Sequence, residues 1–240
     1  MALLFLDLLG VKSHWSSGGR AAAQARFSQF EALISATLSI PGITAPTLGT
    51  VESDAAAFDF ASDESAIRFG AALYQAAFDR PRRPADSRMW LRGTLLTAAA
   101  GSSLRTTGPL AASIAYVQKS SYSDSLLDAI AIEKSGIKGM RLVISDTMLS
   151  AATKAAFVQV IGVRNFYPFR RLNHTGYPTQ IATGFSDVLW MTVGRVTAWE
   201  TSRSQMSKML RWAAADSEEF QQAAATQLAF NEVDAIVQSL

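Results

Sequence analysis

Asp7 and Asp54 are the residues whose type and position best suit metal chemistry. Asp7 interrupts the apolar run at residues 2–9 (ALLFLDLL), and burying a lone carboxylate is unfavourable unless it is paired or bound to a metal. Asp54 lies at the expected tip of a hairpin, where Asp is common. A hairpin beside the first strand would bring both carboxylates to one end of a sheet. We therefore expect hard cations there; a strand-end Asp7 capped by loop amides is the alternative.

The composition of the chain limits which metals these residues would hold. There is no cysteine, and only His14 and His174 offer an imidazole. Carboxylate and carbonyl oxygens must supply most ligands, which favours Mg²⁺ or Mn²⁺ over zinc. One cation would lower the pKa of an attacking hydroxyl, and a second would steady a triphosphate. Backbone amides in the turn at Leu9, Gly10 and Val11 are expected to bind phosphate oxygens.

The elements that position these residues follow from hydrophobic periodicity. Strands are expected at residues 2–9, 89–99, 111–117 and 140–145, with a hairpin at 49–62. Helices are expected at 20–38, 63–78, 123–136, 197–213 and 217–239, and a loop at 10–19. Residues 150–195 have no clear assignment. The order of elements predicts an α+β fold, a mostly antiparallel sheet with helices on one face.

Charge and hydropathy argue against nucleic-acid and membrane partners. The formal net charge of +2 is too small to indicate nucleic-acid binding. We find no apolar stretch long enough for a transmembrane helix. The apolar N-terminal run lacks the basic residues and cleavage site of a signal peptide. We therefore expect a cytoplasmic protein.

The sequence resembles class III nucleotidyl cyclases at four short motifs that occur in the family's order. "LLFLDLLG" resembles their first strand, and "TVESDAAAF" resembles their metal-binding hairpin. The separation of 47 residues between Asp7 and Asp54 is close to the family's usual spacing. "LRGTLL" resembles a later strand whose Arg meets phosphate, and "SDSLLDAIAIEKSGIKGMRLVIS" resembles the helix and strand that complete the site. The resemblance spans residues 3–146.

The resemblance implies a fold, a domain division and a role for each site residue. Residues 1–150 would form a ferredoxin-like cyclase core, and residues 151–240 would complete the sheet and add a C-terminal helical extension within the same domain. Two Mg²⁺ or Mn²⁺ ions would be held by Asp7, Asp54 and the carbonyl of Leu8. The catalytic residues would be Asp7, Asp54 and Arg92. The substrate-binding residues would be Leu9, Gly10, Val11, Thr50, Arg92, Tyr122 and Asp124.

Several positions depart from the purine cyclases of this family. Their base-reading Lys is replaced by Thr50, and their second base reader matches Asp124, with Tyr122 close by. Their transition-state Asn and Arg fall on Leu127 and Ala131. These departures, with "LFLDLLGVK", "WLRGTLL" and a tail containing "VLWM", resemble the bacterial pyrimidine cyclases of anti-phage (Pycsar) systems.

That subgroup implies a homodimer with sites at the interface. Its substrate would be UTP, with CTP second, and a separate effector would sense the cyclic UMP or cyclic CMP. The ribose 3′-oxygen would attack the α-phosphorus, with pyrophosphate leaving. An adenylyl or guanylyl cyclase with atypical base reading is one alternative. Another is a catalytically silent cyclase-like dimerisation module, which the missing Asn/Arg pair supports and the retained Asp7/Asp54 pair opposes.

Overall fold

The computed structural model describes residues 1–79, 89–98, 106–111, 114–117, 124–161, 163–172, 184–193 and 218–240. The first half contains β1 (Ala2–Leu9), α1 (Val11–Leu38), β2 (Leu48–Glu52), β3 (Ala55–Phe60), α2 (Asp63–Asp79), β4 (Trp90–Thr97), β5 (Thr106–Ala111) and β6 (Ile114–Val117). The second half contains α3 (Asp124–Glu133), β7 (Leu142–Ser145), η1 (Asp146–Met148), α4 (Ala151–Phe157), β8 (Gln159–Ile161), β9 (Arg164–Phe166), β10 (Phe169–Arg170), β11 (Phe185–Val188), η3 (Trp190–Thr192) and α6 (Glu218–Gln238).

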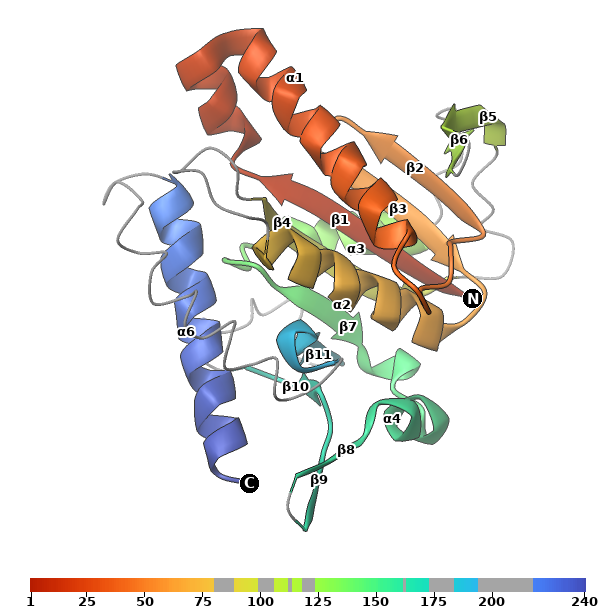
Figure 1. Ribbon diagram of the computed structural model, residues 1–240, viewed down its shortest axis with the longest axis vertical. Coiled ribbons are helices and arrows are strands. Elements are labelled where there is room, and N and C mark those ends of the chain that lie inside the picture. The colour runs from red at the N-terminus through yellow and green to blue at the C-terminus, as the bar shows by residue number, and fades with distance from the viewer. Residues whose placement is uncertain are drawn as a thin grey trace.

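A seven-stranded mixed sheet forms the centre of the molecule, in the order β10-β11-β7-β4-β1-β3-β2 (Figure 1). β1 lies between β3 and β4 and runs antiparallel to both. β4 and β7 pair in parallel. The first six elements run strand, helix, two strands, helix, strand, with the strand order β4-β1-β3-β2 of a ferredoxin-like unit. The predicted α+β fold is confirmed.

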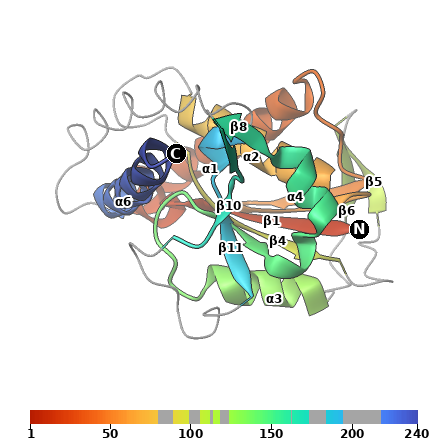
Figure 2. The same ribbon diagram turned by 90° about the horizontal axis from the view of Figure 1, so that it is seen from below.

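Helices cover both faces of the sheet, so the expectation that they lie on one face is wrong for α3. Side chains alternate along a strand, and Leu4 and Leu6 of β1 pack in one core while Leu3 and Phe5 pack in another. α1 and α2 belong to the first core. α3 belongs to the second core, on the opposite side of the sheet (Figure 2). Its buried residues there are Leu126, Ala129 and Ile132.

α1 begins earlier than the sequence indicated. Residues 10–19 were expected to form a loop, yet the helix starts at Val11 directly after Gly10, whose φ is +83°. Only Gly19 has non-helical dihedrals, at φ 65° and ψ −160°, and it bends the helix. The segment before Gly19 is polar and exposed Trp15 lies within it, so it has no apolar stripe from which a helix could be predicted.

Other elements agree with the sequence to differing extents. β1, the β2–β3 hairpin, α2, β4, α3, β7 and α6 match expected elements. The strand expected at 111–117 is instead the second half of a β5–β6 hairpin, which lies against β2. The helix expected at 197–213 lies outside the described residues. Between residues 150 and 195, β10 and β11 add two strands to the central sheet.

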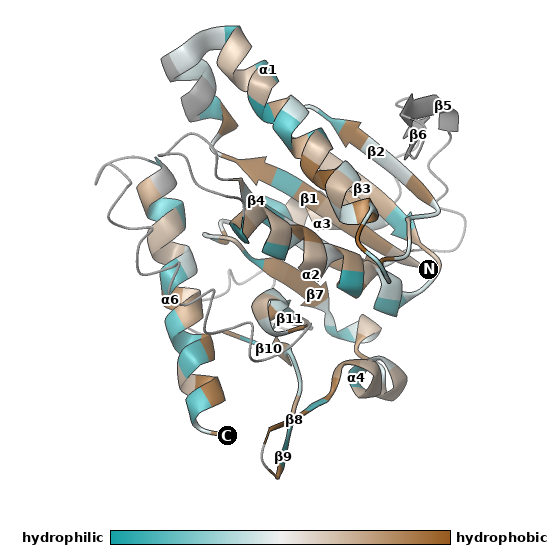
Figure 3. Cartoon of the chain, in the orientation of Figure 1, coloured by the Kyte–Doolittle hydropathy of each residue, from teal (hydrophilic) through white to brown (hydrophobic). Residues whose placement is uncertain are grey.

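α6 packs on the sheet's α2 side through an aromatic cluster. Its Phe230 lies 5.4 Å from Phe78 of α2 and 5.7 Å from Trp190 of η3, measured between ring centroids. Hydrophobic residues make up most of the central strands, whereas hydrophilic and hydrophobic residues alternate along α6 (Figure 3). Each helix in the described part of the chain is too short or too polar to cross a membrane.

Candidate active site

Asp7 and Asp54 meet at the end of the sheet where β1 finishes. The β1–β3 register pairs Asp7 with Ala55, the residue after Asp54. The N–H of Leu8 donates to the Asp54 carbonyl oxygen at 2.7 Å. In the β2–β3 turn Ser53 has φ +52°, and its hydroxyl donates to Asp54 Oδ1 at 2.9 Å. The hairpin therefore fixes the second carboxylate next to the end of the first strand.

Arg92 of β4 joins this pair from the other side of β1. The β1–β4 register places Arg92 opposite Asp7, and Nη2 lies 3.3 Å from Asp7 Oδ2. The same Nη2 donates to Glu133 Oε1 at the end of α3, and Nη1 donates to the carbonyl of Ile137 at 2.8 Å. Arg92 Nε is buried and has no hydrogen-bond partner among the described residues. A phosphate would therefore have to share or displace carboxylate contacts of Arg92.

Asp7, Asp54 and Glu133, together with Arg92, form the group that we call the carboxylate centre, and its electrostatics favour an added cation. Burial raises the pKa of Asp7 from its ordinary 3.8 to about 6; Arg92 opposes that rise, and the charges of Asp54 and Glu218 add to it. Glu218 is the first residue of α6, so the C-terminal helix starts near the centre. Since Glu133 also contacts Arg92, carboxylates outnumber guanidinium groups here within the described residues. Divalent cations would relieve that imbalance.

The donor set fits hard divalent cations in type. Asp7 is 22% exposed at its side chain, so its oxygens are reachable from solvent. The N–H of Leu8 donates to Asp54, so the Leu8 backbone lies beside Asp54, and its carbonyl is the proposed third ligand. Among the described residues there is no group of three or more His, Cys, Asp or Glu side chains arranged to hold a metal. Two carboxylates, supplemented by backbone and substrate oxygens, would have to suffice.

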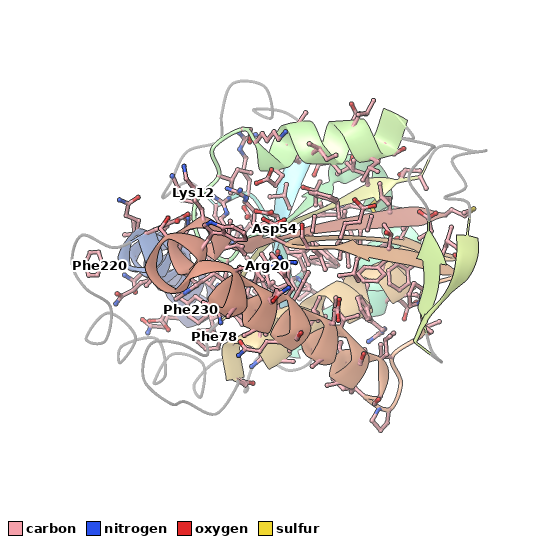
Figure 4. All side chains as sticks on the ribbon, turned by 90° about the horizontal axis from the view of Figure 1, so that it is seen from above. Lys12, Arg20, Asp54, Phe78, Phe220 and Phe230 are labelled. Carbon is pink, nitrogen blue, oxygen red and sulfur yellow. The ribbon has the colours of Figure 1, made fainter. Side chains whose placement is uncertain are left out.

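The expected phosphate-binding turn lies directly beyond these carboxylates. Leu9 ends β1, Gly10 adopts a left-handed conformation as N-cap, and Val11 begins α1. The first N–H groups of a helix have no intrahelical partner and attract anions. Lys12 follows in the first turn, at the same end of the sheet as Asp54 (Figure 4). Lys12 was not among the expected site residues.

The expected base-reading residues are only partly brought to this centre. Thr50 pairs with Ala57 across β2–β3 and so lies on the same sheet face as Asp7. Its Oγ1 is buried without a hydrogen-bond partner among the described residues. Asp124 begins α3, but its side chain is outside the description, as is Tyr122 altogether. Leu127, at the expected transition-state position, is 52% exposed.

A groove of about 720 Å³ lies beside α3, on the face of the sheet that α3 covers. Asp7, Asp54 and Arg92 are not among its lining residues, although Ile132 and Lys134 of the lining flank Glu133. The lining residues are Leu96, Thr97, Ser125, Asp128, Ala131, Ile132, Lys134, Ser145, Thr147 and Phe185.

Glu133, Ile137 and Glu218 are the site residues that sequence reasoning missed. Glu133 lies in the last turn of α3, and in the sequence nothing distinguishes it from an ordinary surface carboxylate of a helix. Ile137 contributes a backbone carbonyl, which no residue type reveals. Glu218 comes from the far end of the chain. The signal that could have found Glu133 is its place in the motif that the cyclase resemblance already covered.

Comparisons with known proteins find similar folds. The sequence matches no protein-family model and no curated protein. The guanylate cyclase domain of RhGC from Catenaria anguillulae, solved with GTP, shares 14% identity, with 78% of this chain and 92% of that chain covered and a TM-score of 0.47.

Two further solved structures give the same picture. The dimeric guanylyl cyclase domain of RhoGC from Blastocladiella emersonii gives 14% identity, the same two coverages and a TM-score of 0.49. Adenylate cyclases from Trypanosoma brucei in their monomeric state give 10% identity, 78% and 85% coverage, and a TM-score of 0.42. These likenesses concern the fold alone.

Proposed function

We propose that the protein is a metal-dependent nucleotidyl cyclase. The observation that carries the proposal is the carboxylate centre: the Leu8–Asp54 hydrogen bond holds Asp54 beside the strand end that bears Asp7, with Arg92 alongside. In this proposal residues 1–150 form the catalytic core. Residues 151–240 complete the sheet and add the C-terminal helix.

The arrangement suggests how the chain's residues would act. Two Mg²⁺ or Mn²⁺ ions at Asp7 and Asp54, with the Leu8 carbonyl, would activate the ribose 3′-hydroxyl and neutralise the triphosphate. The amides around Gly10 would bind phosphate oxygens at the start of α1. Arg92, partly withdrawn from water, would balance the negative charge that develops at the phosphate. The reaction would release pyrophosphate and a 3′,5′-cyclic nucleotide.

The substrate we propose is a pyrimidine nucleoside triphosphate, with UTP favoured and CTP second. Support comes from Thr50, which is short where a purine reader needs a long donor. Its buried hydroxyl, which has no partner in the described parts of the chain, could meet a polar edge of a base. Tyr122 would stack on the base and Asp124 would accept a hydrogen bond from it. As in the anti-phage systems that the sequence resembles, the cyclic UMP or cyclic CMP would signal to a separate effector.

We further propose a two-fold homodimer with shared sites. The carboxylate centre and the groove beside α3 have no residue in common within one chain. In a symmetric dimer, the α3 region of one chain would face the carboxylates of its partner and create two equal sites. A mixture of Asp7→Asn and Asp124→Asn chains should then regain part of the activity, since one intact site forms. An active enzyme that is strictly monomeric at assay concentration would contradict this.

The deciding experiment is incubation of the purified protein with equal UTP, CTP, ATP and GTP and Mn²⁺, with mass identification of products. We expect cyclic UMP to dominate, and the Asp7→Asn variant to give none. A dominant cyclic AMP or cyclic GMP product would show the purine alternative to be correct. If no triphosphate gives a cyclic product, the result would favour the catalytically silent module. The apolar Leu127 and Ala131 at the expected transition-state positions support that alternative.

A further inference from the structure

The short segment after α3 connects the C-terminal helix to Arg92. Its Ile137 carbonyl accepts a 2.8 Å hydrogen bond from Arg92 Nη1, and the Ile137 side chain is itself 2% exposed. Arg141, at the end of the segment, presents its carbonyl to the N–H of Gly93 at 3.0 Å. The segment therefore contacts β4 at Arg92 and at the next residue, and it supplies one of the groups that hold the guanidinium.

α6 holds the other side of this segment through two buried polar side chains. Gln222 Oε1 accepts from the N–H of Gly139 at 2.7 Å, and Thr226 Oγ1 accepts from the N–H of Met140 at 2.9 Å. The Thr226 hydroxyl donates to the carbonyl of Gln222 at 2.7 Å, which leaves its lone pairs directed to Met140. Gln222 is 4% exposed and Thr226 is fully buried.

The backbones of α6 and the segment also approach closely at Gly139. Gly139 has φ +83°, and a Cβ added there would lie 2.8 Å from the backbone nitrogen of Thr226. Only glycine allows this approach without strain. Trp190 Nε1 donates to the Met140 carbonyl at 3.3 Å, and the Tyr74 hydroxyl donates to the Arg141 carbonyl at 2.8 Å. In the described part of the chain, five backbone groups of residues 137–141 are thus held by hydrogen bonds from outside the segment.

The buried face of α6 changes character along its length. Gln222 and Thr226 occupy the N-terminal part of that face, while Phe230 and Val233 continue it at helical spacing in the apolar core. Polar side chains are unfavourable when buried unless their hydrogen bonds are satisfied. Packing alone would be served by apolar residues throughout, so the two polar residues indicate a requirement to hold the segment's N–H groups.

We propose that α6 is a positioning element of the candidate site, in which Gln222 and Thr226 hold residues 137–141 so that Ile137 keeps the Arg92 guanidinium directed at Asp7. α6 also starts close to the site (Figure 1), and its first residue, Glu218, interacts electrostatically with Asp7. The geometric part of this inference is independent of the reaction; only its effect on turnover rests on the proposed function.

The test compares threonine variants of the full chain. Thr226→Val keeps the volume but leaves the Met140 N–H without an acceptor, and Thr226→Ser restores it. Thr37→Val is the matched control, because Thr37 is equally buried and its hydroxyl bonds only to Leu33 of its own helix among the described residues. We expect kcat of Thr226→Val to fall roughly tenfold to hundredfold, as for misplacement of a catalytic group. Thr226→Ser and Thr37→Val should stay within about twofold of the wild type.

A second readout follows Arg92 without needing turnover. In the ¹⁵N NMR spectrum, the Arg92 Nε–Hε signal, assigned with an Arg92→Lys variant, should shift or broaden in Thr226→Val and not in Thr37→Val. Gln222→Met, which removes the acceptor for Gly139, gives an independent variant with the same expected shift if Thr226→Val does not fold.

The outcomes separate this inference from the proposed function. If the wild type makes no cyclic nucleotide, the proposed function fails, and the Arg92 signal alone decides whether α6 positions the guanidinium. If the wild type is active but Thr226→Val matches Thr37→Val in kcat and in the Arg92 signal, α6 is a packing element only. That result would overturn the inference and leave the proposed function standing.

Discussion

Two arginines, Arg92 and Arg141, are bound by carboxylates in contrasting ways. Arg141 is 2% exposed and pairs with Asp187 through two bonds of 2.6 Å, from Nε to Oδ1 and from Nη2 to Oδ2. Arg92 uses one nitrogen for both Asp7 and Glu133, and its Nε has no partner among the described residues. The first pair is balanced and closed to solvent, whereas the second centre is partly exposed and carries more negative than positive charge.

The difference separates a structural ion pair from a candidate reactive one. A two-bonded arginine–carboxylate pair satisfies both partners and fixes one geometry. At the Arg92 centre, burial holds the pKa of Asp7 at about 6 even though a guanidinium is adjacent. Carboxylates with that much unrelieved charge are suited to bind cations, and removing them should affect chemistry more than folding.

The largest expected effect is the loss of cyclisation in Asp7→Asn and in Asp54→Asn. Without its metal ligands the centre would lose several kcal/mol of charge stabilisation, which corresponds to a fall in product formation of about a thousandfold or more. The folded structure should persist, because each substitution keeps the side-chain volume and removes one negative charge from a centre in which carboxylates are in excess. Product formation with Mg²⁺ and Mn²⁺ and the melting temperature measure the two effects.

The matched control for these variants is Asp79→Asn, at an exposed carboxylate that accepts from Gln75 at the end of α2. Its activity should equal that of the wild type. Mn²⁺ should raise the melting temperature of the control and leave that of Asp7→Asn unchanged, since only a competent site gains binding energy. Substantial turnover by both site variants would refute the metal assignment.

The next effect in size is on stability, at the closed pair. Asp187→Ala would remove the carboxylate that makes two hydrogen bonds to buried Arg141, and such a loss typically destabilises by about 3–5 kcal/mol. The Leu172 N–H, which donates to Asp187 Oδ2 at 3.2 Å, would lose its acceptor as well. Urea unfolding measures the change. A value near zero would mean that the two arginines do not differ as described.

Asp59 offers a smaller, pH-dependent comparison, as a carboxylate that is 2% exposed. Burial raises its pKa from 3.8 to about 6, and the N-terminal ammonium opposes the rise. Because the folded-state pKa is the higher one, the folded state binds more protons between these values, and stability falls as pH rises through that window. The loss by pH 7 is on the order of 2–3 kcal/mol.

Asp59→Asn should remove this loss, so its stability advantage over the wild type should grow from pH 4 to pH 7. Unfolding free energies from urea titrations at several pH values measure it. Glu64→Gln is the control, because Glu64 forms an exposed pair with Arg68 and should show no comparable trend. Parallel curves for Asp59→Asn and the wild type would contradict the expectation.

The sequence predicted those parts of the site that depend on local pattern. The apolar run around Asp7 and the alternation around Asp54 indicated a strand and a hairpin, and the structure brings them together. The contacts of Arg92 could not be predicted in this way. Glu133 and Ile137 reach it because α3 packs on the opposite face to α1 and α2, and periodicity does not specify which face a helix covers.

The C-terminal helix shows the same limit. Its existence at residues 217–239 followed from periodicity, but its polar contacts join residues more than eighty positions apart. Gln222 and Thr226 on an otherwise apolar face were the available hint. The early start of α1 at Val11 was missed for a different reason, since its first turns carry no apolar stripe and the left-handed Gly10 alone begins the helix.

The parallel pairing of β4 with β7 has a consequence for how the chain assembles. Residues 93–95 pair with residues 142–144. To form this parallel pairing the chain must close a long loop, and it loses the entropy of that loop before the stabilising contacts form. The β4-β1-β3-β2 half is held together by its own antiparallel pairings, so it can fold first, including while the rest of the chain is still being synthesised. Asp7, Asp54 and Arg92 would thus be gathered early, and Glu133 and Ile137 would join when the second half docks.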